Sequence, residues 1–303
     1  MTPKIFIIVL NWNGHQDTIE CIHSLKKIDY PRYEIIIVDN GSTDGSEEIL
    51  RRSFPAIKLI QTGENLGFAE GNNVGIRYAL DNGADYALIL NNDTAVDKDF
   101  IAELVKAAES DKSIGILSSK IYFYDRPDVL WYAGAVLDLK TGKSVHIGYN
   151  KKDAGQYDTM RETDRACGCS MMISRRACET VGLMDSDYFC YVEEADWSLR
   201  AKNAGYKVVF VPGSKVWHKI SSATGGTGTG YYLYYSVRNH LRLVKTHLPL
   251  KFPGLNILRD ALIVSRYVCS LFTMKINKIR GIKFIWSGMI DSYRGRFGRK
   301  DLI

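Results

Sequence analysis

Four uniformly apolar runs alternate with stretches of helical spacing in the first part of the chain. The runs cover residues 5–10, 35–38, 57–60 and 86–90, and the stretches between them cover 15–27, 43–53 and 67–82. Strands that are apolar on both faces are typical of a parallel sheet that helices cover on both sides. The sequence therefore predicts an α/β fold whose first half holds such a sheet.

Polar side chains end each of these apolar runs. The clusters read NWNG, DNGSTDG, TGENLG and NNDT, and the last of them places two amides and the carboxylate of Asp93 directly after Leu90. A single cluster of this kind is an ordinary turn, since Asn and Asp are good turn formers. Four clusters at the same edge of a parallel sheet instead predict the wall of a ligand cleft.

The bulk composition fits a folded protein. The chain has 303 residues, 46% of them hydrophobic and 24% charged, which is enough for one large domain or for a domain with an appendage. The six cysteines lack a zinc-ligand spacing, so we expect reduced thiols, as in cytosolic proteins. The apolar run at 5–10 is too short for a signal peptide or a membrane span.

Charge is distributed unevenly along the chain. The net charge is +6, yet residues 251–303 carry eleven Lys or Arg against three Asp, so the remaining residues sum to −2. Basic residues among aliphatic ones and Trp286 favour an anionic membrane surface as the partner of this tail. Packing of the tail on the body and a homodimer contact stay open as alternatives. We find no nucleic-acid motif and expect no nucleic-acid partner.

The second half of the chain mixes element types. Helical spacing recurs at 98–110, 193–204, 231–247 and 253–274, whereas 141–165 is polar and is expected to be loop. The Gly/Thr-rich stretch SSATGGTGTGYY, residues 221–232, is typical of a mobile loop. We place a boundary near residue 250.

Several residues at these positions suit the chemistry of a nucleotide site, although each alone is a weak signal. Asp39 follows a strand and can accept hydrogen bonds from a base or ribose, or else form an Asx turn. Asp93 is a plausible ligand for Mg²⁺ or Mn²⁺, and His218 can complete such a site. Glycines at 67, 71 and 75 would let a helix start approach a ligand closely.

The block YVEEADWSLR, residues 191–200, holds the candidate for acid–base chemistry. Glu193, Asp196 and Arg200 share one helical face, which is often a solvated, salt-bridged face. The large apolar residues just before them instead suggest partial burial, which raises the pKa of a carboxyl and suits it to act as a general base. Glu194 is our candidate for that base. Arg238 in YYSVRNH can bind phosphate, or belong to an aromatic core helix.

The order of these motifs resembles family 2 of the inverting glycosyltransferases. The matching segments are VLNWNG, IIIVDNGSTDGS, NLGFAEGNN, LILNND, CGCSMMISR, VGLMDSDYFCYVEEADWSLR, AGYKVVFVP, VWHK and YYSVRN. The chain looks most like the bacterial branch that includes rhamnosyltransferases, over about residues 4–245. The resemblance implies the GT-A fold, with a Rossmann-like nucleotide-binding half at about 1–95, an acceptor half at 96–250, and a C-terminal helical extension at 251–303.

The resemblance also assigns roles to residues of this chain. Nucleotide or donor contacts are expected from Leu10, Asn11, Asn13, Asp39, Asn65, Gly67, Asn72, Asn91, Asn92 and Arg238, the last with Asn239 beside it. The acceptor side or the support of the helix is expected from Trp131, Glu193, Asp196, Trp197 and Arg200. Asp93 and His218 would hold Mn²⁺ or Mg²⁺, and Glu194 would be the base that accepts the proton of an acceptor hydroxyl.

One departure from the family pattern concerns the metal. The triplet here is Asn-Asn-Asp rather than Asp-x-Asp, so Asp93 is its single carboxylate. A divalent ion is still expected, because the diphosphate of the donor supplies further oxygens. The Gly-rich loop 221–230 is expected to close over the donor and exclude water.

The resemblance favours dTDP-L-rhamnose as donor, with UDP-linked hexose or galactofuranose donors as alternatives. The acceptor is expected to be a glycan or lipid-linked hydroxyl in cell-wall or surface-polysaccharide assembly, at the inner face of the cell membrane. Other classes are disfavoured. A nucleotidyltransferase needs a Gly- and Arg-containing signature after the first strand, a dehydrogenase needs GxGxxG, and a non-catalytic scaffold would lose Glu194, Asp93 or His218.

Overall fold

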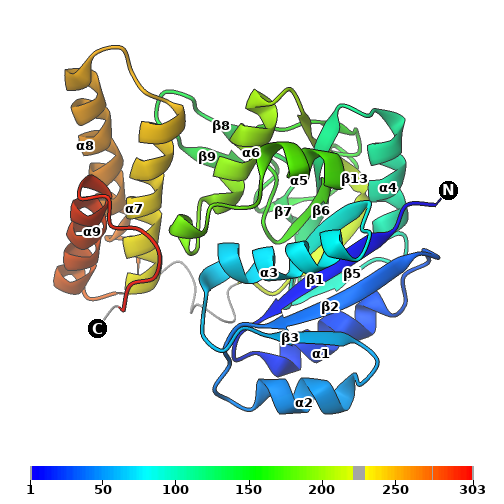
Figure 1. The fold of residues 1–303 in the computed structure, drawn as a ribbon. Coiled ribbons are helices and arrows are strands. Elements are labelled where there is room, and N and C mark those ends of the chain that lie inside the picture. The colour runs from blue at the N-terminus through cyan, green and yellow to red at the C-terminus, as the bar shows by residue number, and fades with distance from the viewer. Residues whose placement is uncertain (1, 221–228, 275, 302–303) are drawn as a thin grey trace.

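The computed structural model describes residues 2–220, 229–274 and 276–301. Figure 1 shows an α/β body beside a group of three helices, α7 to α9. The N-terminal half holds strands β1 (Ile5–Asn11), β2 (Tyr33–Asp39), β3 (Lys58–Gln61) and β4 (Tyr86–Asn91) and helices α1 (His15–Leu25), α2 (Ser46–Ser53) and α3 (Gly67–Asp81). These are the four strands and three helices that the alternation predicts.

The four N-terminal strands are parallel and lie in the order β3-β2-β1-β4. The chain therefore leaves β1 on one side and returns for β4 on its other side, which makes the end of β1 a topological switch point. Register places Asn11 opposite Asp39 and Leu10 opposite Asn91. The polar strand ends predicted from the sequence thus meet at one edge of the sheet.

The second half converts this sheet into a mixed one. It adds β5 (Thr94–Val96), β6 (Ile114–Phe123), β7 (Val129–Tyr132), β10 (Lys151–Lys152), β11 (Arg161–Glu162), β12 (Ser170–Ser174) and β13 (Lys207–His218), while β8 (Ala135–Leu137) and β9 (Ser144–His146) form a separate hairpin. β12 is antiparallel to both β4 and β6. The expectation of loop across 141–165 is wrong in part, because β9, β10 and β11 lie there; these strands are too short and too exposed to show apolar alternation.

Strand β13 carries His218 to the switch point. It runs parallel to β6, and its register shifts between Val211 and Lys215. Its last residues then pair with β5, which places His218 opposite Thr94. The long bent strand is therefore the reason why a residue from position 218 lies beside the turn that follows β4.

Alternate side chains of the central strands supply two cores. Ile5, Ile7 and Val9 of β1 pack in the core that includes α1 and α4 (Phe100–Ser110). Phe6 and Ile8 pack in the opposite core, with α3, α5 (Arg175–Val181) and α6 (Glu193–Asn203). Burial on both faces explains why these runs contain no polar positions.

Two glycines of α3 serve packing on the sheet. A Cβ atom at Gly75 would lie 2.5 Å from Ile8 Cγ2, and one at Gly71 would lie 2.7 Å from Leu10 Cδ1. The sequence interpretation that these glycines make room for a ligand is therefore wrong for both residues. They allow α3 to lie against β1, the strand that ends in the site.

Helices α7 (Gly230–His247), α8 (Pro253–Ser270) and α9 (Lys278–Tyr293) share a small core of their own. Gly288 of α9 lies so close to α7 that a Cβ atom would be 2.5 Å from the carbonyl oxygen of Tyr234. The C-terminal helical extension is thus confirmed, and its inner side packs on α7. Within the described residues, none of the helices combines the length and the apolar character needed to cross a membrane.

Replacing Gly75 by alanine tests the close packing of α3 on β1. We expect Gly75→Ala to lower the free energy of unfolding by about 1–3 kcal/mol, because Ile8 must shift to admit the methyl group. Urea unfolding followed by circular dichroism measures the change. Gly254→Ala is the control, since nothing lies within 4 Å of its added Cβ, and its stability should stay equal or rise by up to about 1 kcal/mol. Equal stabilities of Gly75→Ala and wild type would contradict the packing argument.

Candidate active site

A cleft of about 760 Å³ opens at the carboxyl ends of β1 and β4 and extends to α6 and α7. Ligand sites in sheets of this type are expected at such a switch point. The sequence-predicted residues that line the cleft are Leu10, Asn65, Gly67, Asn91, Asn92, Asp93, Trp131, Glu193, Glu194 and His218.

Asp93 and His218 form a buried pair on the wall of this cleft. Asp93 Oδ1 lies 3.0 Å from His218 Nε2, and the two residues are 4% and 5% exposed. The amide of Asn91 lies 3.4 Å from the same ring nitrogen. The sequence thus predicted correctly that a residue of the β4 turn and a residue 125 positions later come together.

The donor set of this pair fits a divalent cation. Two ligand atoms that bind one ion at about 2.1 Å and at right angles to each other lie about 3 Å apart, which is the Oδ1–Nε2 separation here. The described residues contain no group of three or more His, Cys, Asp or Glu arranged to hold a metal. Further ligands would therefore come from oxygens of a bound diphosphate.

Glu194 lies on the same cleft and is paired with Arg165. Arg165 Nη1 donates to Glu194 Oε1 at 3.1 Å, and Nη2 lies 2.8 Å from His146 Nε2. Because arginine can only donate, His146 Nε2 must accept, and its Nδ1–H must donate to the carbonyl oxygen of Trp131 at 3.1 Å. Burial, with the charge of Arg165 adding to it, lowers the pKa of His146 to about 3 and so keeps the ring neutral.

Trp131 lies between the Arg165–His146 contact and the Asp93–His218 pair. Its ring centroid is 5.0 Å from that of His218 and 4.7 Å from that of His146, both in edge-to-face geometry. Consecutive contacts therefore run across the cleft through six residues: Asp93, His218, Trp131, His146, Arg165 and Glu194.

Glu193 differs from its neighbour in its surroundings. Its residue is 4% exposed, and Oε2 has no hydrogen-bond partner among the described residues. Burial, and after it the charge of Glu194, raise the pKa of Glu193 well above its usual range. The sequence argument that burial raises a carboxyl pKa in this block therefore applies to Glu193, whereas Glu194 is the carboxyl that has an arginine partner.

The segment before α6 is held in a strained conformation. Phe189, Tyr191 and Val192 have φ values of 63°, 66° and 77°, which is exceptional for a β-branched residue such as valine. The amide of Asn239 donates to three carbonyl oxygens of residues 188–191, each at 2.8 Å. The resemblance placed Asn239, like Arg238, near the diphosphate or the closing loop, and in the structure it supports the turn that presents Glu193 and Glu194.

Arg238 also lies outside the cleft, contrary to its predicted contact with the donor. The residue is 1% exposed, and its guanidinium donates to the carbonyl oxygens of Asp187, Tyr188 and Gly298 at 2.7–3.0 Å. These bonds connect α7 to the turn before α6 and to the C-terminal segment. A guanidinium that is committed to three backbone carbonyls is not available to a phosphate.

Asp39 and Asn11 form a layer behind the cleft wall. Asp39 is fully buried and accepts hydrogen bonds from Asn11 Nδ2, the backbone N–H of Ser42 and Gln61 Nε2 at 2.7–2.9 Å. The resemblance assigns both residues to the nucleotide. In the structure they join the ends of β1, β2 and β3, and their contact with a nucleotide stays a prediction.

Asn13 and Asn72 likewise have structural partners and do not line the cleft. Asn13 Oδ1 accepts from the backbone N–H of Thr43 at 2.8 Å, and Asn72 Nδ2 donates to the carbonyl oxygen of Phe68 at 2.8 Å. Nucleotide contacts by these two residues stay predictions. Short polar side chains at strand and helix ends satisfy local backbone groups as readily as they bind ligands.

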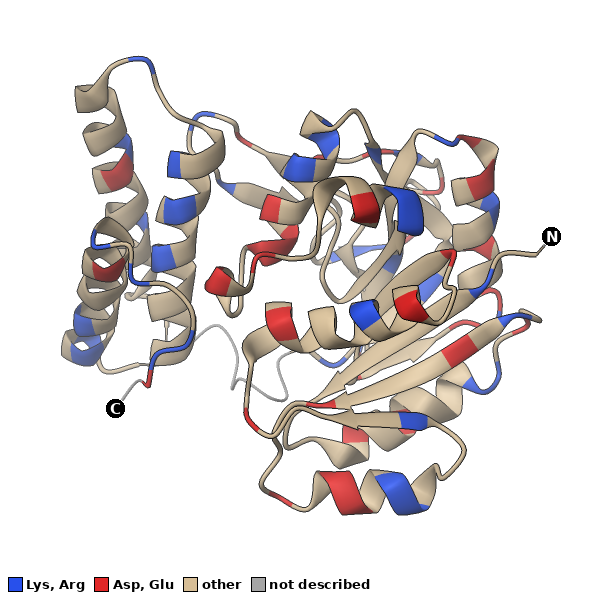
Figure 2. Ribbon diagram, viewed as in Figure 1, with Lys and Arg blue, Asp and Glu red and all other residues tan. Residues whose placement is uncertain are grey.

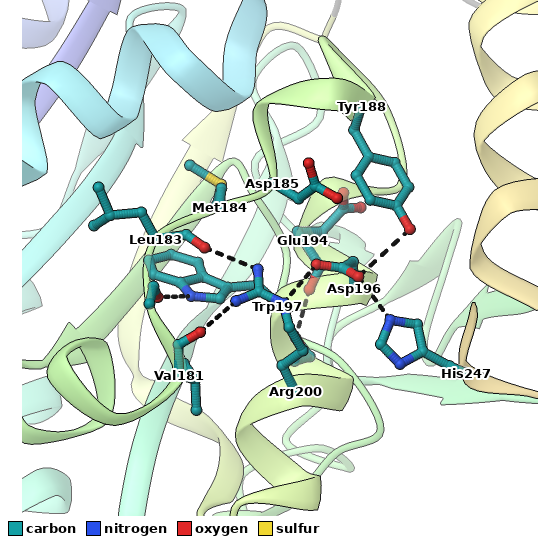
Figure 3. A network of polar contacts seen from close by, with 12 residues as sticks. Val181, Leu183, Met184, Asp185, Tyr188, Glu194, Asp196, Trp197, Arg200 and His247 are labelled. Atoms are coloured by element: carbon teal, nitrogen blue, oxygen red, sulfur yellow. Dashed lines mark hydrogen bonds and ion pairs between the residues drawn. The ribbon is translucent and has the colours of Figure 1, made fainter. Parts of the chain in front are cut away.

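The remaining residues of the Glu-Glu-x-Asp-Trp-x-x-Arg block form a network on the other side of α6 (Figure 3). Arg200 pairs with Asp196 at 2.8 Å and donates to two carbonyl oxygens in the segment 181–183. Trp197 Nε1 donates to a carbonyl oxygen of the same segment at 2.9 Å. Burial opposes the charge of Asp196, but the bonds from His247 and Arg200 outweigh it and lower the pKa of Asp196. These residues support the helix, which is one of the two roles expected for them.

Sequence reasoning did not identify several cleft residues. Asn40, directly after Asp39, bonds Asn65 Oδ1 and the Gly67 carbonyl oxygen, each at 3.1 Å, and lines the cleft. Arg165, just before CGC, had no motif to single it out. Other aromatic residues that line the cleft are Trp12, Phe68, Phe123, Tyr149, Tyr191, Tyr231, Tyr232 and Tyr267. Most of the expected closing loop, 221–228, lies outside the described residues.

The sheet is mixed and has a switch point at its cleft. This cleft contains both the Asp93–His218 pair, which suits a metal, and Glu194 with its arginine partner. Together these features define a glycosyltransferase of the GT-A class. The model of the family "Glycosyl transferase family 2" matches residues 6–182. The chain belongs to this family.

Relatives of similar length carry rhamnosyltransferase names. The chain is 24% identical to the dTDP-rhamnosyl transferase RfbF of Shigella flexneri over 309 residues, which covers 98% of both chains. It is also 24% identical to the N-acetylglucosaminyl-diphospho-decaprenol L-rhamnosyltransferase of Mycobacterium tuberculosis, over 94% of this chain and 99% of that one. The hexosyltransferase Agl10 of Haloferax volcanii is 28% identical over 69% of this chain and 64% of its own.

Solved structures support the fold. GalNAc-T7, solved with UDP, GalNAc and Mn²⁺, matches with a TM-score of 0.64 at 16% identity, over 90% of this chain and 58% of that one. The mannosyltransferase PcManGT of Pyrobaculum calidifontis, solved with GDP-Man and Mn²⁺, matches with a TM-score of 0.60 at 15% identity, over 98% of this chain and 87% of its own.

Replacing Arg238 by lysine separates the structural role from direct donor binding. We expect Arg238→Lys to lower the free energy of unfolding by about 2–4 kcal/mol, because one ammonium cannot reproduce the bonds to three carbonyls. Nucleotide affinity, measured by calorimetry on the folded variant, should stay within about twofold of wild type. Unchanged stability together with a tenfold loss of affinity would show that Arg238 contacts the ligand after all.

Proposed function

We propose that this protein transfers L-rhamnose from dTDP-L-rhamnose, with inversion, to a hydroxyl of a glycan or lipid-linked acceptor in cell-wall or surface-polysaccharide assembly. Support for the sugar comes from the two relatives that match over nearly their whole length and carry rhamnosyltransferase names. A hexose from a UDP-linked donor is the second candidate, because the Haloferax relative is named a hexosyltransferase.

The observation that carries the proposal is the continuous series of contacts from Asp93 to Glu194 across one cleft. Glycosyl transfer with a single displacement needs two chemical functions on one site. Charge on the departing diphosphate must be offset, and a base must accept the proton of the attacking hydroxyl. The pair of Asp93 with His218 and the paired Glu194 supply these two functions.

The donor fits the part of the cleft formed by the strand ends. Leu10, Asn40, Asn65, Asn91 and Asn92 line it with one apolar side chain and four amides, which suits a base and a ribose. When bound by Asp93 and His218, Mn²⁺ or Mg²⁺ supplies positive charge that offsets the charge developing on the diphosphate.

Glu194 accepts the proton of the acceptor hydroxyl in this proposal. Arg165 contacts its Oε1 and fixes the orientation of the carboxylate, while the side chain stays 18% exposed on the cleft. The neutral His146 holds Arg165 from its other side without adding a second positive charge. No covalent intermediate on the enzyme is required, since a single displacement inverts the anomeric carbon.

We further propose that the acceptor is lipid-linked and that the enzyme acts at the cytoplasmic face of the cell membrane. The name of the mycobacterial relative gives a diphospho-decaprenol acceptor for that protein. The aromatic residues Tyr191, Tyr231 and Tyr232 on the α6–α7 side of the cleft suit the flat face of an acceptor sugar.

Nucleotide binding with metal tests the donor site. We expect dTDP with Mn²⁺ at a hundredfold excess over its Kd to raise the Tm by roughly 5 °C, because a ligand that binds the folded state adds about 2.7 kcal/mol to its stability. UDP, GDP and CDP are the comparison ligands. Asp93→Asn should lose the part of the shift that depends on Mn²⁺. Failure of every nucleotide to shift the Tm would overturn the donor-site proposal, and a shift with UDP alone would favour the UDP-linked donor.

Two isosteric substitutions distinguish the roles of the adjacent glutamates. We expect Glu194→Gln to lower kcat at least 100-fold with donor affinity unchanged, since the base is lost. Glu193→Gln should retain kcat within roughly threefold, because an amide resembles the protonated carboxyl that burial favours at this position. Single-turnover transfer to a lipid-linked acceptor measures both. Equal losses in the two variants would contradict the assignment of Glu194 as the base.

A further inference from the structure

Exposed apolar side chains concentrate on α8, α9 and the residues next to them. Of the seventeen large hydrophobic side chains that are exposed within the described residues, eleven lie between positions 252 and 293. They are Phe252, Leu255, Ile257, Leu258, Leu262, Phe272, Ile279, Ile282, Trp286, Ile290 and Tyr293. An apolar patch of this kind on one side of a protein indicates an interaction surface.

Helix α8 buries two charged side chains and exposes several apolar ones. Arg259 and Asp260 face inward and are each 4% exposed, while Ile257 and Leu258 face outward and are 66% and 57% exposed. The inward charges are satisfied in part, since Arg259 donates to the Leu248 carbonyl oxygen and Asp260 accepts from a tyrosine hydroxyl, while Arg259 Nε, Arg259 Nη2 and Asp260 Oδ1 have no hydrogen-bond partner among the described residues. A helix that buries its charged side chains and exposes its leucines does not have the pattern of a helix whose outer face contacts only water.

Helix α9 has a matching apolar stripe. Ile279, Ile282, Trp286, Ile290 and Tyr293 are spaced by three or four residues, so they share one helical face. The opposite face of α9 packs on α7. Trp and Tyr are the aromatic residues enriched where a protein meets the headgroup region of a bilayer.

Among the described residues of α8 and α9, the exposed charges are of one sign. Exposed basic residues of α8, α9 and their ends are Lys251, Arg266, Lys278, Arg280, Lys283 and Arg294. The two acidic residues of these helices, Asp260 and Asp291, are 4% and 3% exposed. Figure 2 shows the placement of basic and acidic residues on the helices at the left of the molecule.

We propose that the outward side of α8 and α9, here called the α8–α9 face, docks on the surface of an anionic lipid bilayer. Two contributions bind such a protein surface to a bilayer. Apolar side chains enter the interfacial region of the bilayer, and basic side chains contact the acidic headgroups. A second copy of the chain is a poorer occupant, because a symmetric dimer apposes the same patch on both subunits and so brings like charges together.

Helix α7 connects the docking face to the cleft. Tyr231, Tyr232 and Ser236 of α7 line the cleft, while Leu233 and Val237 of the same helix pack in the core shared with α8 and α9. Tyr267 of α8 itself also lines the cleft, so a docked α8–α9 face lies directly beside the cleft. Docking would bring a lipid-linked acceptor close to the cleft. This consequence rests on the proposed function, whereas the docking itself does not.

Co-sedimentation of the full chain with vesicles tests the docking. We expect binding to vesicles that contain equal amounts of phosphatidylcholine and phosphatidylglycerol, and binding at least tenfold weaker to phosphatidylcholine alone. The double variant Leu258→Gln/Trp286→Gln should weaken binding to the anionic vesicles at least tenfold, because two apolar contacts are lost. The matched control Val136→Gln/Leu139→Gln changes residues that are 54% and 61% exposed elsewhere, and should bind like wild type.

Three outcomes would overturn the proposal. The first is that the wild-type protein does not bind anionic vesicles, and the second is that the control variant loses as much vesicle binding as Leu258→Gln/Trp286→Gln. The third is that light scattering shows a wild-type dimer, which Leu258→Gln/Trp286→Gln converts to a monomer while vesicle binding stays unchanged. The Mn²⁺-dependent nucleotide shift of the Tm should be the same in both double variants and wild type. A failure of docking is thereby distinguished from a failure of the donor-site proposal.

Discussion

The hydrogen bonds from Asn239 to the backbone of residues 188–191 are the contact on which the site depends. The turn that they hold contains non-glycine residues with positive φ, and Val192 with φ 77° is both β-branched and the residue that precedes α6. Such a conformation costs free energy and persists only where surrounding contacts determine it. The hydrogen bonds from the Asn239 side chain hold the turn in this conformation. They therefore fix the start of α6, whose first two residues are Glu193 and Glu194.

The same turn explains how two adjacent carboxyls acquire different properties. Glu193 is buried, which disfavours its charge, and Glu194 accepts a hydrogen bond from Arg165. Consecutive helical positions differ by about 100° in direction, so a fixed helix start is sufficient to separate their environments. Arg165 is in turn oriented by a neutral His146, whose proton is fixed on Nδ1 by the Trp131 carbonyl. The chemistry of the site therefore depends on backbone geometry that lies outside the cleft.

The sequence predicted the features that depend on local pattern. Uniformly apolar runs are enough to define a sheet covered on both faces, and polar strand ends are enough to locate its cleft. Direct donor contact was wrong for Arg238, because its partners lie about fifty positions away and are backbone carbonyls, which leave no signature in side-chain types. Arg165 was missed for the same reason, since its importance comes from Glu194, 29 positions later. The outward direction of the α8 leucines was equally hidden, because spacing shows that a helix has faces but not which face is covered.

Helix α7 is where these separate constraints combine. It carries Asn239 and Arg238 for the strained turn, aromatic residues for the cleft, and Leu233 and Val237 for the helices behind it. A helix surrounded on three sides has little freedom to exchange residues, and most of its positions between 233 and 244 are buried. In the sequence, its charged and aromatic composition fitted either a phosphate-binding segment or an aromatic core helix. The structure shows a more demanding requirement, since Arg238 and Asn239 bond specific backbone carbonyls of the turn that presents Glu194 to the cleft.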